Sequence, residues 1–201
     1  MLGVRQMAAM AVTSPTLGRW LTGTGITANG GGASGAIYTS DRKTVSLNAI
    51  DIPGGAETPV IFIHGLYGAA GNFRSVMKQL SKLSKQCRPF FSLDLRNHGA
   101  SPWSNDCSVL SMAADVHDFI ETNELGPSML VGHSLGGRTA MATALHFPSA
   151  VDSLMVVDMS PEAQMAVGDG GGGGVRAVGR AMYDMPQEVM ASRKAADEFL
   201  A

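Results

Sequence analysis

The chain has 201 residues, of which 45% are hydrophobic and 16% are charged, a balance typical of a folded globular domain. Its formal net charge of −2, without basic blocks, gives no electrostatic signature of nucleic-acid binding. No uninterrupted apolar stretch approaches the ~18 residues of a membrane span. Two cysteines, Cys87 and Cys107, lie outside any CxxC or Cys/His spacing, so we expect free thiols and neither a disulfide scaffold nor a metal site.

The first 40 residues differ in composition from the rest. They contain Arg5 and Arg19, many serines and threonines, and no acidic residue before Asp41. Transit peptides share this basic, hydroxyl-rich and acid-poor composition. Residues 1–40 are therefore predicted to be a targeting or disordered segment, mitochondrial in preference to plastid, with a cytoplasmic protein carrying a flexible tail as the alternative. A short amphipathic helix is a further expectation, from the spacing of Met7, Met10 and Leu17.

From residue 44 onward, strand patterns alternate with helix patterns. Strands are expected at residues 44–50, 59–63, 89–94, 128–131 and 153–158. Helices are expected from Phe73 to Leu83, from a Ser111 cap to Gly126, and from the residue after Ser134 to Phe147. The alternation predicts an α/β fold with a mostly parallel sheet over residues 44–161. A glycine run at 170–174 predicts a flexible insertion, followed by helices at 177–183 and 186–201.

A Gly-x-Ser-x-Gly pattern, Gly132 to Gly136, lies between the apolar strand at 128–131 and a helix of small residues. This setting is that of a nucleophile elbow, in which a strained turn projects the serine hydroxyl above the sheet edge. Gly132 and Gly136 are expected because a Cβ at either position would collide as strand and helix fold back. The pattern therefore predicts Ser134 as a catalytic nucleophile.

Acyl transfer from an ester also requires donors for the developing oxyanion. The backbone N–H of Leu135, directly after the serine, is one expected donor. The second is expected from the loop after the 59–63 strand, and we predict the Leu66 N–H, presented by a turn at Gly65.

Two aspartates end strands at the edge where ligands collect in α/β sheets. Asp158 is a candidate for the carboxylate that orients a catalytic histidine, with a capping or loop role as the alternative. Asp94 is expected to pair with Arg96 or to anchor its loop.

None of the five histidines has the position that the Ser, Asp, His order of this fold requires. His133 adjoins the nucleophile, His64 belongs to the oxyanion turn, and no histidine follows Asp158. The expected catalytic histidine is therefore missing from these 201 residues.

Four ordered motifs carry a resemblance to a known family over Pro59–Pro161. They are HGLYG at 64–68, DLRNHG at 94–99, GHSLGG at 132–137 and VVDMSP at 156–161. Together they resemble the α/β-hydrolase superfamily, within it a branch of mitochondrial hydrolase-domain proteins and bacterial esterases. The resemblance implies an α/β-hydrolase fold and an esterase or lipase-like acyl hydrolase that uses neither metal nor organic cofactor.

The resemblance also implies what should follow the core. A helical cap would begin after Pro161, so residues 162–201 are interpreted as the start of that cap with a glycine-rich insertion. Further strands and the histidine would come after it, and we expect the sheet to be incomplete, with an exposed apolar edge at the 153–158 strand.

The leading hypothesis is a serine hydrolase that acts on a small-molecule acyl ester, without nucleic-acid partner or stable membrane span. The alternative is a catalytically inactive protein on a hydrolase scaffold, with a ligand-binding or interaction role. The acyl substrate and the oligomeric state cannot be read from the sequence.

Overall fold

The computed structural model describes residues 9–13, 43–84, 88–160 and 180–200. The chain divides into two compact units, Met1–Pro161 and Glu162–Ala201. Cys87 and the glycine run lie outside the described residues, as does most of the predicted targeting segment, whose function stays a prediction.

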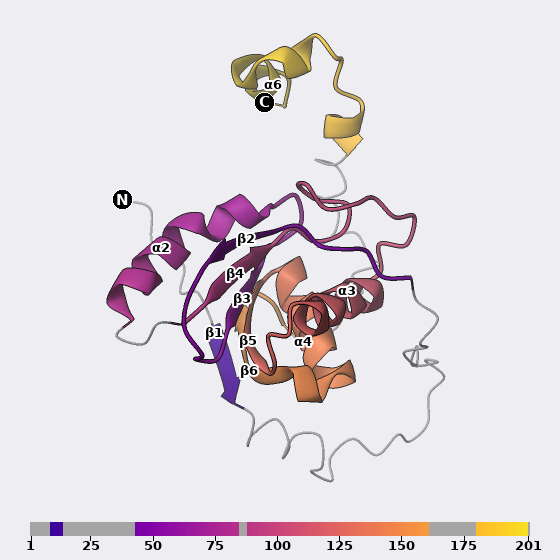
Figure 1. Cartoon of the computed structure of the whole chain (residues 1–201). Helices are drawn as coiled ribbons and strands as arrows, with labels where there is room; N and C mark the ends of the chain where they lie inside the picture. The colour runs from indigo at the N-terminus through magenta and orange to yellow at the C-terminus, as the bar shows by residue number, and fades with distance from the viewer. Residues whose placement is uncertain (1–8, 14–42, 85–87, 161–179, 201) are drawn as a thin grey trace. The chain divides into compact units, whose positions relative to one another are not determined.

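The first unit is built on a six-stranded sheet in the order β1-β6-β5-β3-β4-β2 (Figure 1). Its strands are β1 (Ala9–Thr13), β2 (Ala49–Ile52), β3 (Val60–Ile63), β4 (Phe90–Leu93), β5 (Ser128–His133) and β6 (Val151–Val157). The four central strands, β4, β3, β5 and β6, are parallel, and antiparallel β2 and β1 form the two edges. The predicted mostly parallel α/β sheet is confirmed.

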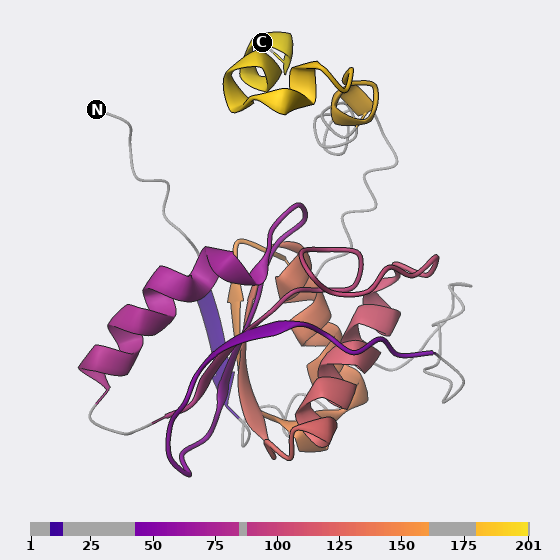
Figure 2. The same ribbon diagram turned by 45° about the horizontal axis from the view of Figure 1, so that its top comes forward.

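Helices cover both faces of this sheet (Figures 1 and 2). A 3-10 turn, η1 (Ala70–Phe73), leads into α2 (Arg74–Leu83) on one face. The other face carries α3 (Val109–Thr122) and α4 (Leu135–His146), and a short η2 (Pro148–Ala150) leads into β6.

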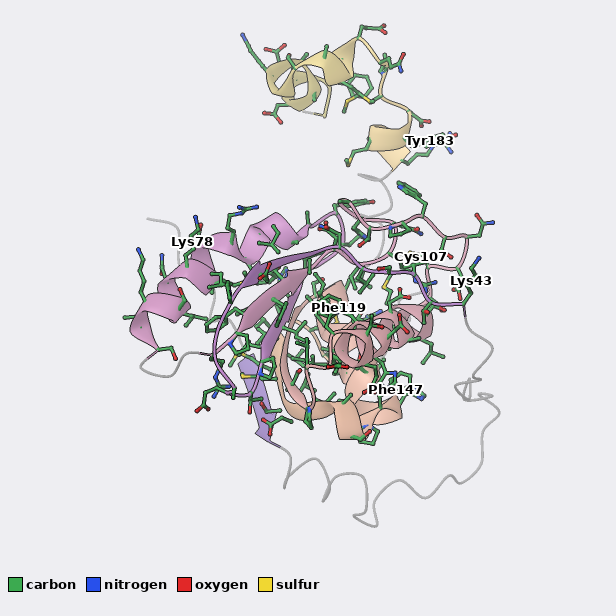
Figure 3. All side chains as sticks on the ribbon, in the orientation of Figure 1. Lys43, Lys78, Cys107, Phe119, Phe147 and Tyr183 are labelled. Carbon is green, nitrogen blue, oxygen red and sulfur yellow. The ribbon has the colours of Figure 1, made fainter. Side chains whose placement is uncertain are left out.

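Two apolar layers hold the helices on the sheet, because successive residues of a strand point to opposite faces. Along β3, Ile61 and Ile63 belong to the layer under α3 and α4, whereas Val60 and Phe62 belong to the layer under α2. Figure 3 shows the side chains of the first layer around Phe119 of α3.

The strand expected at residues 44–50 begins later, at Ala49. The backbone N–H of Val45 donates to Asp115 Oδ1 at 2.9 Å, and that of Asn48 donates to Ser101 Oγ at 2.8 Å. Side chains thus satisfy these backbone groups, and ladder pairing starts only where they end.

The bounds of α3 also differ from the expectation. Ser108, and not Ser111, caps the helix, since its hydroxyl accepts from the Ser111 N–H at 3.3 Å. The helix ends at Thr122, before Gly126, which takes a left-handed conformation (φ +65°) in the turn into β5.

Two expectations about the sheet edge and the N-terminal region are wrong. Residues 9–13 form a strand and not part of an amphipathic helix. This strand pairs antiparallel with β6, from Ala9 opposite Val157 to Thr13 opposite Ser153, so the outer edge of β6 is covered. The physical reason is that an unpaired row of backbone donors and acceptors on β6 is satisfied by any extended segment that reaches it.

The second unit contains short helices. Residues 180–183 are helical, followed by a 3-10 turn η3 (Val189–Ala191) and α6 (Arg193–Leu200). Two exposed i,i+4 ion pairs, Arg180–Asp184 and Lys194–Glu198, lie along them. The interpretation of this unit as the start of a cap stays a prediction. Among the described residues of either unit, no helix has the length and apolar character to cross a membrane.

Candidate active site

Ser134 is the single residue between the end of β5 at His133 and the start of α4 at Leu135. Its backbone is strained, with φ 52° and ψ −115°. Two hydrogen bonds hold this conformation: the Ser134 N–H donates to the Val157 carbonyl at 3.0 Å, and its carbonyl accepts from the Arg138 N–H at 3.1 Å. The predicted strand–turn–helix geometry is therefore present around this serine.

The two glycines of the pattern are required by close backbone contacts. A Cβ on Gly132 would lie 2.3 Å from the Gly136 carbonyl oxygen. One on Gly136 would lie 2.2 Å from the carbonyl oxygen of Ile63, in the neighbouring strand. Both contacts are impossible for a real side chain, which confirms the steric reason given for these glycines.

The turn after β3 lies directly against the serine. A Cβ on Gly65 would come within 3.2 Å of Ser134 Cβ and 3.0 Å of His133 Nδ1. The turn is closed by the Gly68 N–H, which donates to the Gly65 carbonyl at 2.9 Å. The structure thus brings Gly65, and with it the Leu66 backbone, to the same place as Ser134 and the first turn of α4, where N–H groups lack intrahelical partners.

His64 is buried beneath this turn, and both of its ring nitrogens are engaged. Nε2 accepts from the Leu95 N–H at 3.1 Å, and Nδ1 lies 2.7 Å from the Gly65 carbonyl oxygen. Because a backbone N–H can only donate, Nε2 must be unprotonated and Nδ1 must carry the proton. Burial lowers the pKa of His64, against the Gly65 hydrogen bond, which raises it. Because this neutral imidazole uses both ring nitrogens in hydrogen bonds, it is not available to take a proton from Ser134.

Asp94, at the end of β4, anchors the loops on either side of it. Its carboxylate accepts from the N–H of Ala70 at 2.6 Å, the N–H of Ala100 at 3.0 Å and the side-chain amide of Asn48 at 2.8 Å. Burial alone would raise the pKa of this carboxyl, but the three hydrogen bonds together hold it below its usual value. A Cβ on Gly99 would lie 2.2 Å from the Asp94 carboxyl carbon, so the loop also requires that glycine. The loop-anchoring interpretation of Asp94 is confirmed.

The predicted Asp94–Arg96 pair, in contrast, is wrong. Arg96 is fully buried and forms a bidentate ion pair with Asp115 of α3, at 2.6 Å from Nε and 2.7 Å from Nη2. Nη1 also donates to the Asp106 carbonyl and Nη2 to the Lys43 carbonyl. The side-chain hydrogen bond to Asp115 raises the pKa of Arg96. Sequence reasoning missed this pair, since nothing local marks a mid-helix aspartate as the partner of a loop arginine.

Asp158 follows the last residue of β6 and is exposed, with φ 54°. In the parallel register of β5 and β6, His133 pairs with Val157. Ser134 and Asp158 are therefore the next residues of two adjacent strands, at the same edge of the sheet. The structure places this predicted acid beside the elbow.

The other histidines fall into two groups. His98 lies at the same edge as Ser134: its ring contacts that of His64 at 4.9 Å between centroids, and its Nδ1 bonds the Arg96 carbonyl. His146 ends α4, roughly 16 Å along the helix from Leu135 at 1.5 Å per residue. His117 belongs to that distant end, because it stacks on Phe147 at 4.0 Å (Figure 3).

Two further observations concern a surface hollow away from Ser134 and the absence of a metal-ligand cluster among the described residues. A surface hollow lies at the amino ends of β3 and β5, opposite the elbow; its lining includes Glu57, Pro59, Glu124 and Pro127. In the described part of the chain, no three His, Cys, Asp or Glu side chains gather as metal ligands.

The elbow, the glycine turn beside it and the parallel sheet agree with the comparison to known families. A family model described as the alpha/beta hydrolase fold matches residues 58–170, which is more than half of the chain. The chain belongs to the α/β-hydrolase fold family.

The names of two relatives refer to ester chemistry. This chain is 40% identical over 167 residues to the sn-1-specific diacylglycerol lipase ABHD11 of Mus musculus, covering 81% of this chain and 52% of that protein. It is 37% identical over 106 residues to ethanol acetyltransferase 1 of Kluyveromyces marxianus, covering 53% of this chain and 29% of that protein.

Among solved structures, a marine microorganism esterase is 31% identical with a TM-score of 0.66, covering 78% of this chain and 58% of that one. The chain spans 41% and 52% of the length of the ABHD11 proteins of Danio rerio and Mus musculus.

Proposed function

We propose that this chain carries the nucleophile and oxyanion site of a serine hydrolase that cleaves carboxylic esters. The observation that carries the proposal is Ser134 in its strained turn, with the Gly65 turn packed against it. In the proposed reaction, Ser134 Oγ attacks the ester carbonyl carbon and its proton passes to a general base. The resulting tetrahedral oxyanion accepts hydrogen bonds from the N–H groups of Leu66 and Leu135. Its collapse breaks the bond to the alkoxy oxygen, which takes the proton back from the base and leaves as the alcohol. Water releases the acyl group from the serine in the second half of the cycle.

For the acid of the triad we propose Asp158. Its place beside Ser134 in the β5–β6 register supports this role, because a histidine held between them would bridge the two adjacent strand ends. Among the five histidines, His64 is committed to two hydrogen bonds, and His117 and His146 belong to the far end of α4.

The substrate class that we propose is an acyl ester of a lipid type, such as an acylglycerol. The support is the 40% identity to a diacylglycerol lipase over 81% of the chain. The similarity to an ethanol acetyltransferase favours a second candidate, in which a small alcohol replaces water in the second step. A third candidate remains from the sequence: a hydrolase scaffold without turnover that binds a ligand.

A fluorophosphonate probe tests the nucleophile directly, because it phosphonylates only an activated serine. We expect a form of the protein that also supplies the catalytic histidine to be labelled, and its Ser134→Ala variant to lose the label. The 201 residues alone, in which no histidine follows Asp158, should react at least about a thousandfold more slowly. Ser81→Ala is the matched control, since that hydroxyl lies on α2, on the sheet face opposite α4, and donates to the Lys78 carbonyl (Figure 2). Label that persists in Ser134→Ala contradicts the assignment, and a histidine-containing form that stays unlabelled favours the scaffold candidate.

The same preparation separates hydrolysis from transfer. With a p-nitrophenyl ester as donor, chromatography measures how the acyl group divides between free acid and ethyl ester as ethanol is added. Free acid alone supports the hydrolase, whereas an ethyl ester that dominates at low ethanol supports the transferase.

A further inference from the structure

The peptide unit that joins Gly65 to Leu66 is held at its carbonyl end by two donors. The Gly68 N–H reaches the Gly65 carbonyl oxygen at 2.9 Å, and His64 Nδ1 reaches the same oxygen at 2.7 Å. An oxygen with two donors has both lone pairs engaged, so the plane of this peptide unit cannot turn without losing a hydrogen bond.

The other end of the same unit is the Leu66 N–H. In a trans peptide the C=O and N–H bonds point in opposite directions across one rigid plane. Because the carbonyl points to the buried His64 ring, the Leu66 N–H points away from that ring. Among the described residues no acceptor is bonded to this N–H, and Gly65 lies against Ser134.

We propose that His64 is a positioning residue that fixes the direction of the oxyanion donor at Leu66 by holding the carbonyl of the same peptide unit. This inference rests on the proposed function, because it assigns the Leu66 N–H to the oxyanion. It gives His64 a role other than that of the general base.

The imidazole is itself fixed in the one state that can perform this role. The Leu95 N–H donates to Nε2, which leaves the proton on Nδ1, the nitrogen that faces the Gly65 carbonyl. The His98 ring also contacts the imidazole, with 4.9 Å between the ring centroids. Leu95 directly follows Asp94, whose carboxylate also accepts from the Ala70 N–H. Hydrogen bonds thus connect the loop after β3 to the loop after β4.

A hydrogen bond to the carbonyl also polarises the peptide unit. Electron density drawn toward the Gly65 oxygen makes the Leu66 N–H a stronger donor, as in other chains of hydrogen bonds. His64 thus acts on the oxyanion through one peptide bond and without touching substrate.

Two substitutions separate the two hydrogen bonds of His64. An asparagine amide nitrogen can take the place of Nδ1 and still donate to Gly65, but it leaves Leu95 without its acceptor. A glutamine amide oxygen can take the place of Nε2 and still accept from Leu95, but it leaves the Gly65 carbonyl with one donor. His64→Asn therefore keeps the hydrogen bond to the Gly65 carbonyl, which orients the Leu66 N–H, and His64→Gln keeps only the hydrogen bond from the Leu95 N–H.

The first measurement is the rate at which a fluorophosphonate labels Ser134 in a form of the protein that also supplies the catalytic histidine, with melting temperature as the measure of fold. Removing a whole oxyanion donor costs 10²–10³ in rate; we expect about a tenfold loss or more in His64→Gln and a loss of only a fewfold in His64→Asn. On p-nitrophenyl acetate the Gln variant should lower kcat and leave KM unchanged. His117→Asn is the control, because that ring lies at the other end of α4.

The second measurement needs no reactive serine. In ¹H–¹⁵N spectra, the Leu66 amide should keep its wild-type shift in His64→Asn and move in His64→Gln. Equal rate losses in both variants, in proportion to their melting temperatures, would overturn the proposal, as would a Leu66 amide that ignores both substitutions. An unreactive Ser134 in the wild type would sink the proposed function instead, and the Leu66 amide would still decide the role of His64.

Discussion

The guanidinium of Arg96 is buried and donates its hydrogen bonds to groups inside the protein. It joins α3, through Asp115, to the Lys43 and Asp106 carbonyls in two separate loops. A buried ion pair is costly to form, and removing one partner is costlier still because the other charge remains in the interior. The ion pair therefore fixes the two loops relative to α3 more than it adds to the free energy of unfolding.

Arg96→Met should destabilise the first unit by about 3–5 kcal/mol, since it leaves the Asp115 carboxylate buried without its counter-charge. Urea unfolding followed by circular dichroism measures this change. Lys78→Met is the control: Lys78 is exposed on α2 (Figure 3), and its loss should shift the unfolding free energy by only about 0.5 kcal/mol. Similar small shifts in both variants would contradict a structural role for the buried pair.

The lowered pKa values of His64 and Asp94 predict acid sensitivity in two steps. The unfolded chain binds a proton on His64 near the ordinary value of 6.5, whereas the folded chain resists it, so stability falls as pH drops below that value. Asp94 adds a second loss below its ordinary value of 3.8. Melting temperatures from pH 8 to pH 3 measure both steps, and His64→Asn should remove only the upper one. An unchanged upper step in that variant would show that protonation of His64 does not cause it.

At the scale of elements, the elbow depends on how closely β5, α4 and β3 approach one another. Gly132→Ala should lower stability by about 1–3 kcal/mol or more, because its Cβ would meet the Gly136 backbone, which cannot move aside as a flexible side chain would. Gly71→Ala, in η1, is the matched control: nothing lies within 4 Å of its added Cβ, and alanine should be neutral or slightly stabilising. Calorimetric melting of the two variants distinguishes them. Equal melting temperatures would show that the elbow tolerates a side chain.

Local patterns predicted the elbow because its chemistry is local: strand, strained serine and helix follow one another within a few residues. Asp158 could be placed at the right edge for the same reason, since a strand end fixes its position. The Arg96–Asp115 ion pair and the hydrogen bond from His64 to the Gly65 carbonyl could not be predicted. They depend on side-chain directions that only the packing of loops on α3 and β4 determines.

For the whole molecule, the pairing of β1 with β6 carries the largest consequence for solubility. Replacing Ala11 and Val12 together by proline removes two successive N–H groups, one of which must face β6, since neighbouring residues alternate in direction. We expect faster amide exchange on the outer side of β6, unchanged protection on its β5 side, and increased aggregation by light scattering. A monodisperse double variant with unchanged exchange would show that β6 does not depend on β1.

The same pairing orders events during synthesis. Thr13 leaves the ribosome about 140 residues before its partner Ser153, and at 5–20 residues per second this delay is about 7–30 s. Contacts so distant in the chain form late, because their loop must close before they contribute any energy. The first strand made is therefore the last to join the sheet. Until Ser153 has been made, this segment has no strand of the sheet to pair with and stays accessible to chaperones and proteases.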